Sequence, residues 1–201
     1  MKFSKYKVDK MFRLGYRLAF ETNTKSKKWN DIFSLWFTSA NHGHKRSQFY
    51  LGACYDNGNG TAKNISLAYK WFLQAAKQGH KESQYNIGFF YHKGELVKQD
   101  FKKAVYWFTF SASQGDTEAQ RDLGYCYLYG EGVKKNEKKA VEFYKKAASK
   151  NDEKALFNLG LCFKYGDGVQ QSKRWAKHYF LKAAAYGHKN TKQQLKALSK
   201  M

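Results

Sequence analysis

Pairs of glycines separated by one residue are the first feature of this sequence that could do chemistry. They stand at Gly58 and Gly60, Gly130 and Gly132, and Gly166 and Gly168. Glycine-rich loops can cradle a phosphate with their backbone amides. No Lys-Ser/Thr pair follows these glycines, and they recur at a fixed spacing. We therefore interpret them as helix ends, where glycine adopts the left-handed conformation cheaply.

Histidine is the next candidate, because its ring can bind a metal or transfer a proton. His44, His80 and His188 each follow a glycine at the end of a repeated block. A metal site needs ligands that converge on one ion, whereas equivalent positions of a repeat array are spread along its length. We expect exposed turn histidines, and we predict no metal site and no cofactor.

Cysteine could supply a nucleophile, a metal ligand or a disulfide. Cys54, Cys126 and Cys162 occupy one register, since they are separated by multiples of 36 residues. Equivalent residues on stacked helices lie roughly 8–10 Å apart, which is beyond the Cα separation of about 7 Å that a disulfide tolerates. We predict buried free thiols in a reducing compartment.

Other catalytic patterns are absent from the sequence. It contains no G-x-S-x-G and no H-E-x-x-H, so we predict that the chain is not an enzyme. Basic residues interrupt every apolar run near the N-terminus, which argues against a signal peptide. No stretch approaches the ~18 apolar residues of a membrane span. We therefore predict a cytoplasmic protein.

The elements that must position any site recur with a period of 36 residues. The period is marked by Leu51-Gly52, Ile87-Gly88, Leu123-Gly124 and Leu159-Gly160. A constant period of this length predicts a solenoid of helix pairs. We place the first helix of each pair, helix A, at roughly 46–57, 82–93, 118–129 and 153–165. We place the start of the second, helix B, after the N-cap residues Asn64, Asp100, Asn136 and Ser172.

Each helix A carries a glycine in its middle, at a cost of about 1 kcal/mol against alanine. Four repetitions of this cost indicate a close approach of helix B with no room for a Cβ. The large side chains expected to fill the remaining space on helix B are Trp71, Trp107, Phe143 and Tyr179, with Tyr144 and Phe180 near them.

The run Leu-Gly-x-x-Tyr-x-x-Gly-x-Gly, then a cap, Lys-Ala-x-x-Trp, Ala-Ala and Gly, resembles the Sel-one-like repeat, a relative of the tetratricopeptide repeat. We predict one repeat domain over 1–201. It comprises a degenerate first repeat at 9–44, full repeats at 45–80, 81–116, 117–152 and 153–188, and a C-terminal capping helix at 189–201. Glu95-Leu96 departs from the pattern by replacing the second loop glycine. The loop near Thr22 to Lys28 has lost its glycines.

The resemblance implies an all-α, right-handed superhelix of antiparallel helix pairs and a noncatalytic adaptor. Members of this family are associated with protein–protein interaction, signalling complexes and bacterial host contact, and some sit in toxin–immunity loci. We therefore expect another protein as the partner. A cytoplasmic immunity protein that neutralises a cognate toxin is an alternative.

The concave groove of such a superhelix is the first candidate binding surface, and helix A should line it. Residues two before and two after the buried Leu or Ile point away from helix B. The groove residues that we predict are Phe49, Tyr85, Phe89, Arg121, Tyr125 and Phe157. Aromatic rings with an arginine have the composition of a binding hot spot, and Arg121 offers a planar fork to a carboxylate. The alternative is that the twist of the solenoid itself covers several of these side chains.

A basic strip near the start of helix B is the second candidate. It consists of Lys98, Lys102, Lys134, Lys138 and Arg174. The sequence has 37 Lys and Arg against 16 Asp and Glu, a formal charge of +21, which favours acidic partners. Solvation of helix faces is the ordinary role of such lysines. Binding of nucleic acid or an anionic surface stays open as a further alternative.

Overall fold

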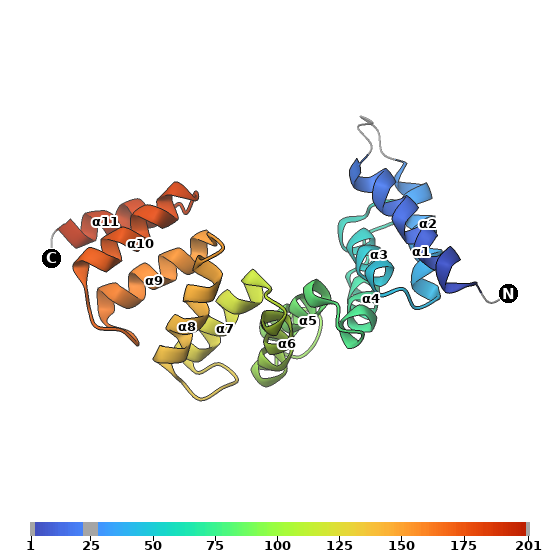
Figure 1. Ribbon diagram of the computed structural model, residues 1–201. Helices are drawn as coiled ribbons and strands as arrows, with labels where there is room; N and C mark the ends of the chain where they lie inside the picture. Colours follow the sequence, from blue (N-terminus) through green and yellow to red (C-terminus); the bar gives the residue numbers. More distant parts are fainter. Residues whose placement is uncertain (1–2, 22–27, 200–201) are drawn as a thin grey trace. The chain divides into compact units, whose positions relative to one another are not determined.

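The computed structural model describes residues 3–21 and 28–199, which form helices joined by short loops and no strand (Figure 1). Residues 22–27, where most of the glycine-free loop was expected, lie outside the described residues. In chain order the helices are α1 (Lys5–Tyr16), the π-helical turn η1 (Arg17–Glu21), α2 (Trp29–Asn41), α3 (Lys45–Asn57), α4 (Ile65–Lys77), α5 (Lys81–Lys93), α6 (Phe101–Ser113), α7 (Thr117–Tyr129), α8 (Glu137–Ala148), α9 (Glu153–Tyr165), α10 (Lys173–Ala185) and α11 (Thr191–Ser199).

The odd-numbered helices α1 to α9 are the A helices, and the even-numbered helices α2 to α10 are the B helices. The chain forms two compact units. The N-terminal unit consists of Met1–Phe90 and Gly94–Lys98, and the C-terminal unit of Tyr91–Lys93 and Gln99–Met201. The boundary falls in the repeat that carries Glu95-Leu96. The expected single repeat domain over 1–201 stays a prediction.

Local signals set the helix ends where the sequence predicted them. The side chains of Asn64, Asp100, Asn136 and Ser172 each accept a hydrogen bond from the backbone N–H three residues later and begin a B helix. Gly58, Gly94, Gly130 and Gly166 end A helices in the left-handed conformation, with φ of 77°, 73°, 78° and 88°. The interpretation of these glycines as helix caps is confirmed.

The glycines inside the A helices permit close packing, as predicted. A Cβ at Gly124 would lie 2.6 Å from the ring of Tyr144, and one at Gly160 would lie 2.5 Å from the ring of Phe180. The ring that meets the glycine stands one residue later than we expected. Positions 72, 108, 144 and 180 are buried, whereas Trp71, Trp107, Phe143 and Tyr179 are half-buried.

The one-residue difference between the expected and the observed ring follows from helical geometry. Ala68 and Phe72 on α4 are both buried, and residues four apart share one helix face. Trp71 is rotated by about 100° from Phe72, and therefore stands at the edge of that face. The alanine that admits the neighbouring helix and the ring that fills the remaining space are thus four residues apart, not three.

The three cysteines are free and buried, as predicted. Cys54, Cys126 and Cys162 are each at most 1% exposed. Burial raises the pKa of each thiol to about 12, so each stays protonated and unreactive at neutral pH. None of the described helices has the length and apolar composition that a membrane crossing requires.

Candidate partner-binding surface

Two of the three junction histidines, His44 and His80, are helix caps, and all three are half-buried and not the exposed turn residues that we expected. The Nδ1 atom of His44 accepts a hydrogen bond from Ser47 N at 3.2 Å, and that of His80 accepts one from Ser83 N at 3.4 Å. Only a neutral ring can accept at Nδ1. Burial is the main cause that lowers the pKa of His44, His80 and His188, to about 4 for His80.

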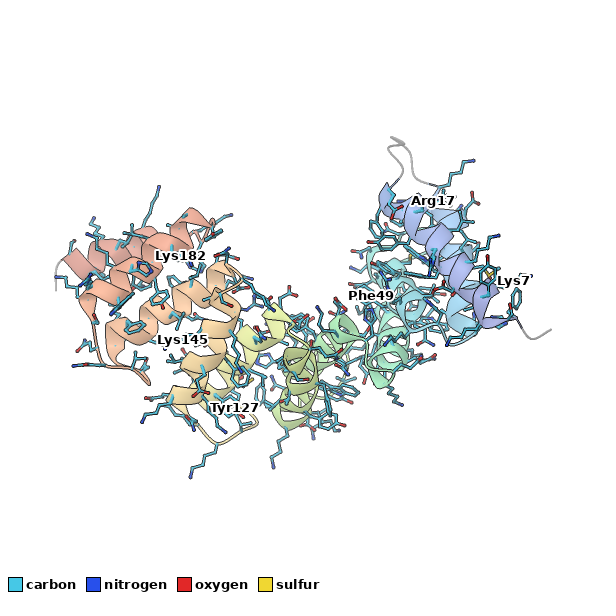
Figure 2. All side chains as sticks on the ribbon, viewed as in Figure 1. Lys7, Arg17, Phe49, Tyr127, Lys145 and Lys182 are labelled. Carbon is cyan, nitrogen blue, oxygen red and sulfur yellow. The ribbon has the colours of Figure 1, made fainter. Side chains whose placement is uncertain are left out.

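Three of the predicted groove residues contact the residue at the following repeat junction, which for Phe49 and Arg121 is the cap of the next A helix. Phe49 stacks on His80 with ring centroids 4.6 Å apart, and Phe157 stacks on His188 at 4.1 Å (Figure 2 labels Phe49). Arg121 stands at the same register and pairs with Asp152. Each contact joins residues 31 positions apart. Phe49 and Arg121 therefore link their own A helix to the cap of the next one.

Arg121 is already engaged by carboxylates of its own chain. Its Nη1 lies 3.0 Å from Asp152 Oδ2, and its Nε lies 3.0 Å from Asp122 Oδ1. The Arg121 side chain is only 13% exposed. The fork that we expected to meet a partner's carboxylate is therefore occupied. A role for Phe49, Arg121 and Phe157 in partner binding stays a prediction.

The other three predicted groove residues present aromatic surface. Phe89 and Tyr125 occupy one register of the A helices and are 40% and 39% exposed, while Tyr85 is half-buried. The rings of Tyr85 and Phe89 are 6.2 Å apart in the N-terminal unit. In the C-terminal unit, the ring of Tyr125 lies 4.5 Å from that of the exposed Tyr129. Each unit therefore carries an aromatic pair on an A helix.

The Tyr85–Phe89 pair lines a hollow of about 640 Å³ in the N-terminal unit, which we call the Leu96 hollow. Ile65 and Leu96 add apolar walls, and Asp56 and Glu95 add carboxylates. A concave, mainly apolar surface with a few polar groups is typical of a binding site. The pattern of the sequence did not reveal Ile65 as part of it.

The Leu96 hollow has a cause in the loop sequence. In other repeats the second loop glycine touches the first residue of the preceding B helix. A Cβ added at Gly60 would lie 2.3 Å from Trp29 O, and one added at Gly132 would lie 2.2 Å from Phe101 O. Leu96 stands at this register, and a side chain excludes so close an approach. The loop therefore cannot close over Ile65, and the departure at Glu95-Leu96 was the signal for a local difference.

The predicted basic strip is exposed at all five positions. Lys98 belongs to the N-terminal unit, whereas Lys102, Lys134, Lys138 and Arg174 belong to the C-terminal unit. None of the five forms an ion pair with another described residue. Two nearby lysines do, since Lys103 pairs with Asp100 at 3.4 Å and Lys135 with Glu137 at 2.9 Å.

Metal chemistry finds no support in the described ranges 3–21 and 28–199, where no group of three or more His, Cys, Asp or Glu side chains could hold an ion. Each junction histidine packs against a ring instead, and His44 and His80 also cap a helix. The described surface offers exposed aromatic area on both A and B helices, and unpaired cations on or just before the B helices. This composition suits macromolecular recognition better than small-molecule chemistry.

Repeated helix pairs with glycine-mediated contacts define the class of α-helical solenoid proteins. Within that class, the chain belongs to the Sel1 repeat family, because the family model matches residues 45–80, 81–116, 117–152 and 153–188. The Sel1 repeat is in general a protein–protein interaction module, and its members are generally non-catalytic scaffolds. The α1–α2 pair lies before the matched residues.

Solved structures show the same fold. A Sel1 repeat protein from Oxalobacter formigenes matches with a TM-score of 0.83 and 31% identity, covering 95% of this chain and 78% of that chain. The protective antigen c5321 of uropathogenic Escherichia coli matches with a TM-score of 0.83 and 28% identity, covering 94% of this chain and 40% of that chain.

A more distant match is the immunity protein Pa5087 from Pseudomonas aeruginosa. Its TM-score is 0.55 at 20% identity, and the match covers 88% of this chain and 64% of that chain. At this identity the likeness shows the fold alone. No curated protein matches the chain.

Proposed function

We propose that this chain is a non-enzymatic module that binds another protein through the aromatic faces of its A helices. One observation carries the proposal. Phe89 and Tyr125 stand at the same register of successive A helices, and each leaves about two fifths of its surface exposed, at 40% and 39%. Aromatic side chains are among the residue types that dominate binding energy at protein interfaces.

The Leu96 hollow supports the same proposal. It places Tyr85 and Phe89 beside Ile65 and Leu96, so that a partner's side chain could enter and bury several apolar groups at once. Anchor residues that fill desolvated pockets dominate binding energy. Arg121 has no place among the proposed anchors, because its contacts lie within the chain.

The experiment compares one ring on an A helix with one on a B helix of the same unit. Wild-type protein first captures its partner from native cells, and mass spectrometry identifies it. Calorimetry then measures the partner's affinity for Tyr125→Ala on α7 and for Tyr106→Ala on α6, where Tyr106 is 56% exposed. We expect Tyr125→Ala to lose about 1–2 kcal/mol of binding free energy, and Tyr106→Ala to bind like wild type. The reverse pattern would move the site to the B helices.

An immunity role is a narrower form of the same proposal, in which the captured partner is a toxin encoded beside this chain. Binding of a polyanion through the basic strip is a separate alternative, which the exposed and unpaired Lys102, Lys138 and Arg174 favour. We propose the cytoplasm as the compartment, in keeping with three buried free thiols.

A further inference from the structure

We propose that a second hollow, between α1 and the start of α3, binds a carboxylate-rich segment of the partner protein. This inference rests on the proposed function and adds the chemistry of the partner. The hollow encloses about 560 Å³ in the N-terminal unit. Its cations are Lys10, Arg13, Arg17 and Arg46. We call it the α1–α3 hollow.

Charge is the first argument. Glu21 is the single carboxylate among the described lining residues. Asp9 neutralises Arg13, with Nε and Oδ2 2.7 Å apart. Lys10, Arg17 and Arg46 form no ion pair with a described residue, and all three are exposed (Figure 2 labels Arg17, on η1). An acidic segment would supply the missing countercharges.

Arg46 is the second argument, because its side chain is held in place before any ligand arrives. Its guanidinium carbon lies 4.6 Å from the ring centroid of Phe12 and 5.5 Å from that of Tyr16. Its charge also acts on Tyr50, where it opposes the rise in pKa that burial causes. A guanidinium already held over rings loses little entropy on binding, and its planar fork matches a carboxylate.

Exposed apolar groups on α1 and η1 are the third argument. Tyr6, Leu14 and Phe20 are 77%, 37% and 52% exposed. Cations beside exposed apolar groups suit a segment in which carboxylates alternate with apolar side chains.

A protein segment fits this hollow better than a nucleic acid does. Single-stranded nucleic acids bind by stacking bases on open aromatic faces. Phe12 is only 3% exposed, and the guanidinium of Arg46 lies over both Phe12 and Tyr16. The two rings that line the hollow are therefore covered, while the Arg46 side chain is exposed and open to an anion.

Fluorescence anisotropy tests the proposal with defined probes. One probe is a labelled pool of octapeptides with four Asp or Glu and one Phe or Leu at randomised positions, and a second pool carries Asn and Gln instead. The third probe is a labelled octathymidylate. The proteins are wild type, Arg17→Ala, Arg46→Ala, and a control with Lys70→Ala and Lys77→Ala, two exposed lysines of α4 in the same unit.

We expect wild type and the α4 control to bind the acidic pool equally. We expect Arg17→Ala and Arg46→Ala each to bind it about tenfold more weakly, and the amide pool to bind no protein measurably. Arg17 is exposed and unpaired in the described residues, so Arg17→Ala remains informative even if Arg46→Ala disturbs the stack on Phe12.

Three results would overturn the inference: no binding of the acidic pool by wild type, an equal loss in the α4 control, or tighter binding of octathymidylate than of the acidic pool. None of them bears on Tyr125→Ala and the native partner. Failure of this inference is therefore distinguishable from failure of the proposed function.

Discussion

At the repeat junctions, histidine and aspartate caps satisfy the same backbone amide in different surroundings. His80 accepts from Ser83 N, and its Nδ1 also lies 3.2 Å from the Ser83 hydroxyl. Asp152 accepts from Ala155 N at 2.7 Å, and no hydroxyl is available at that position. The aspartate cap holds a charge that Arg121 balances, whereas the histidine cap works only while its ring is neutral.

Stability should therefore fall in mild acid, and His80 should contribute to the decline. Its pKa is lowered from 6.5 to about 4, chiefly by burial; Glu82 opposes this shift, while Lys45, Arg46 and Lys81 add to it. Between these values the unfolded chain binds a proton that the folded chain does not. The contribution is complete above pH 6.5 and is lost as the pH falls towards 4.

Thermal melting between pH 7.5 and 4.5 measures this effect. The matched variant is His80→Asp, which introduces the cap that the third and fourth full repeats use. We expect the melting temperature of wild type to drop more steeply between pH 6.5 and 5 than that of His80→Asp. Equal slopes would show that the protonation of His80 is not coupled to folding.

Replacement of Arg121 should lower the free energy of unfolding, whether or not it affects partner binding. Arg121→Ala leaves Asp152, whose side chain is 9% exposed, without its ion-pair partner. An unsatisfied charged group that is largely buried costs about 1.5–3 kcal/mol. Denaturant unfolding of Arg121→Ala should show this loss.

The second variant needed is Arg121→Ala with Asp152→Asn, because asparagine keeps the cap and removes the charge. We expect it to recover most of the lost free energy of unfolding. A double variant as unstable as Arg121→Ala would mean that packing of the arginine stem, and not the ion pair, is what matters.

At the scale of the helices, much of the fold could be predicted because its signals are local. A cap such as Asn64 and a glycine such as Gly58 act within one turn of the chain, so their positions alone fix the helix ends. The contact of Phe49 with His80 joins residues 31 positions apart, so no pattern within one helical turn predicts it. The one signal in the sequence was a second aromatic residue and histidine at the same spacing, Phe157 and His188.

The candidate site was harder to predict for the same reason. Periodicity predicted the groove-lining face of helix A for both Phe49 and Phe89. Only the packing shows that Phe49 stacks on a cap whereas Phe89 is exposed. The Leu96 hollow depends on how near a loop comes to Ile65, which is a distance between helices. Sequence spacing carries no such distance.

The close contact of α7 and α8 gives a prediction at this scale. In an open helix, Gly124→Ala would stabilise by up to about 1 kcal/mol. Here the new Cβ would stand 2.6 Å from the buried ring of Tyr144. Overpacking costs about 1–3 kcal/mol, so we expect net destabilisation in a denaturant titration.

Combining Gly124→Ala with Tyr144→Leu provides the control, since the smaller side chain relieves the clash. The coupling free energy of this double-mutant cycle should be favourable. A stabilised Gly124→Ala single variant would refute the close-approach explanation of the helix glycines.

At the scale of the whole molecule, a charge of +21 guarantees some retention on any polyanion. What needs testing is whether the basic strip contributes more to this retention than other surface cations do. When a protein partner binds on the A helices, the basic strip takes no part in binding. The strip should then behave as ordinary solvated charge. Reversing Lys102, Lys138 and Arg174 to Glu should lower the salt concentration of elution from heparin only as much as any equal change of charge.

The comparison variant reverses three other exposed lysines of the C-terminal unit, namely Lys145, Lys154 and Lys192. Both triple variants should elute at the same salt concentration and show the same slope of log affinity against log salt. A much larger loss for the strip variant would favour the polyanion alternative.

Site-specific photo-crosslinking is the measurement that tests the proposed partner-binding role of the A helices most directly. A benzoylphenylalanine placed at Phe89 or Tyr125 samples the A helices, and one at Tyr106 or Trp175, which are 56% and 48% exposed, samples the B helices. Irradiation in native cells followed by mass spectrometry identifies the adducts. We predict that positions 89 and 125 crosslink the same protein and that positions 106 and 175 do not. Adducts to that protein from 106 and 175 alone, or adducts to nucleic acid from all four, would contradict the proposed function.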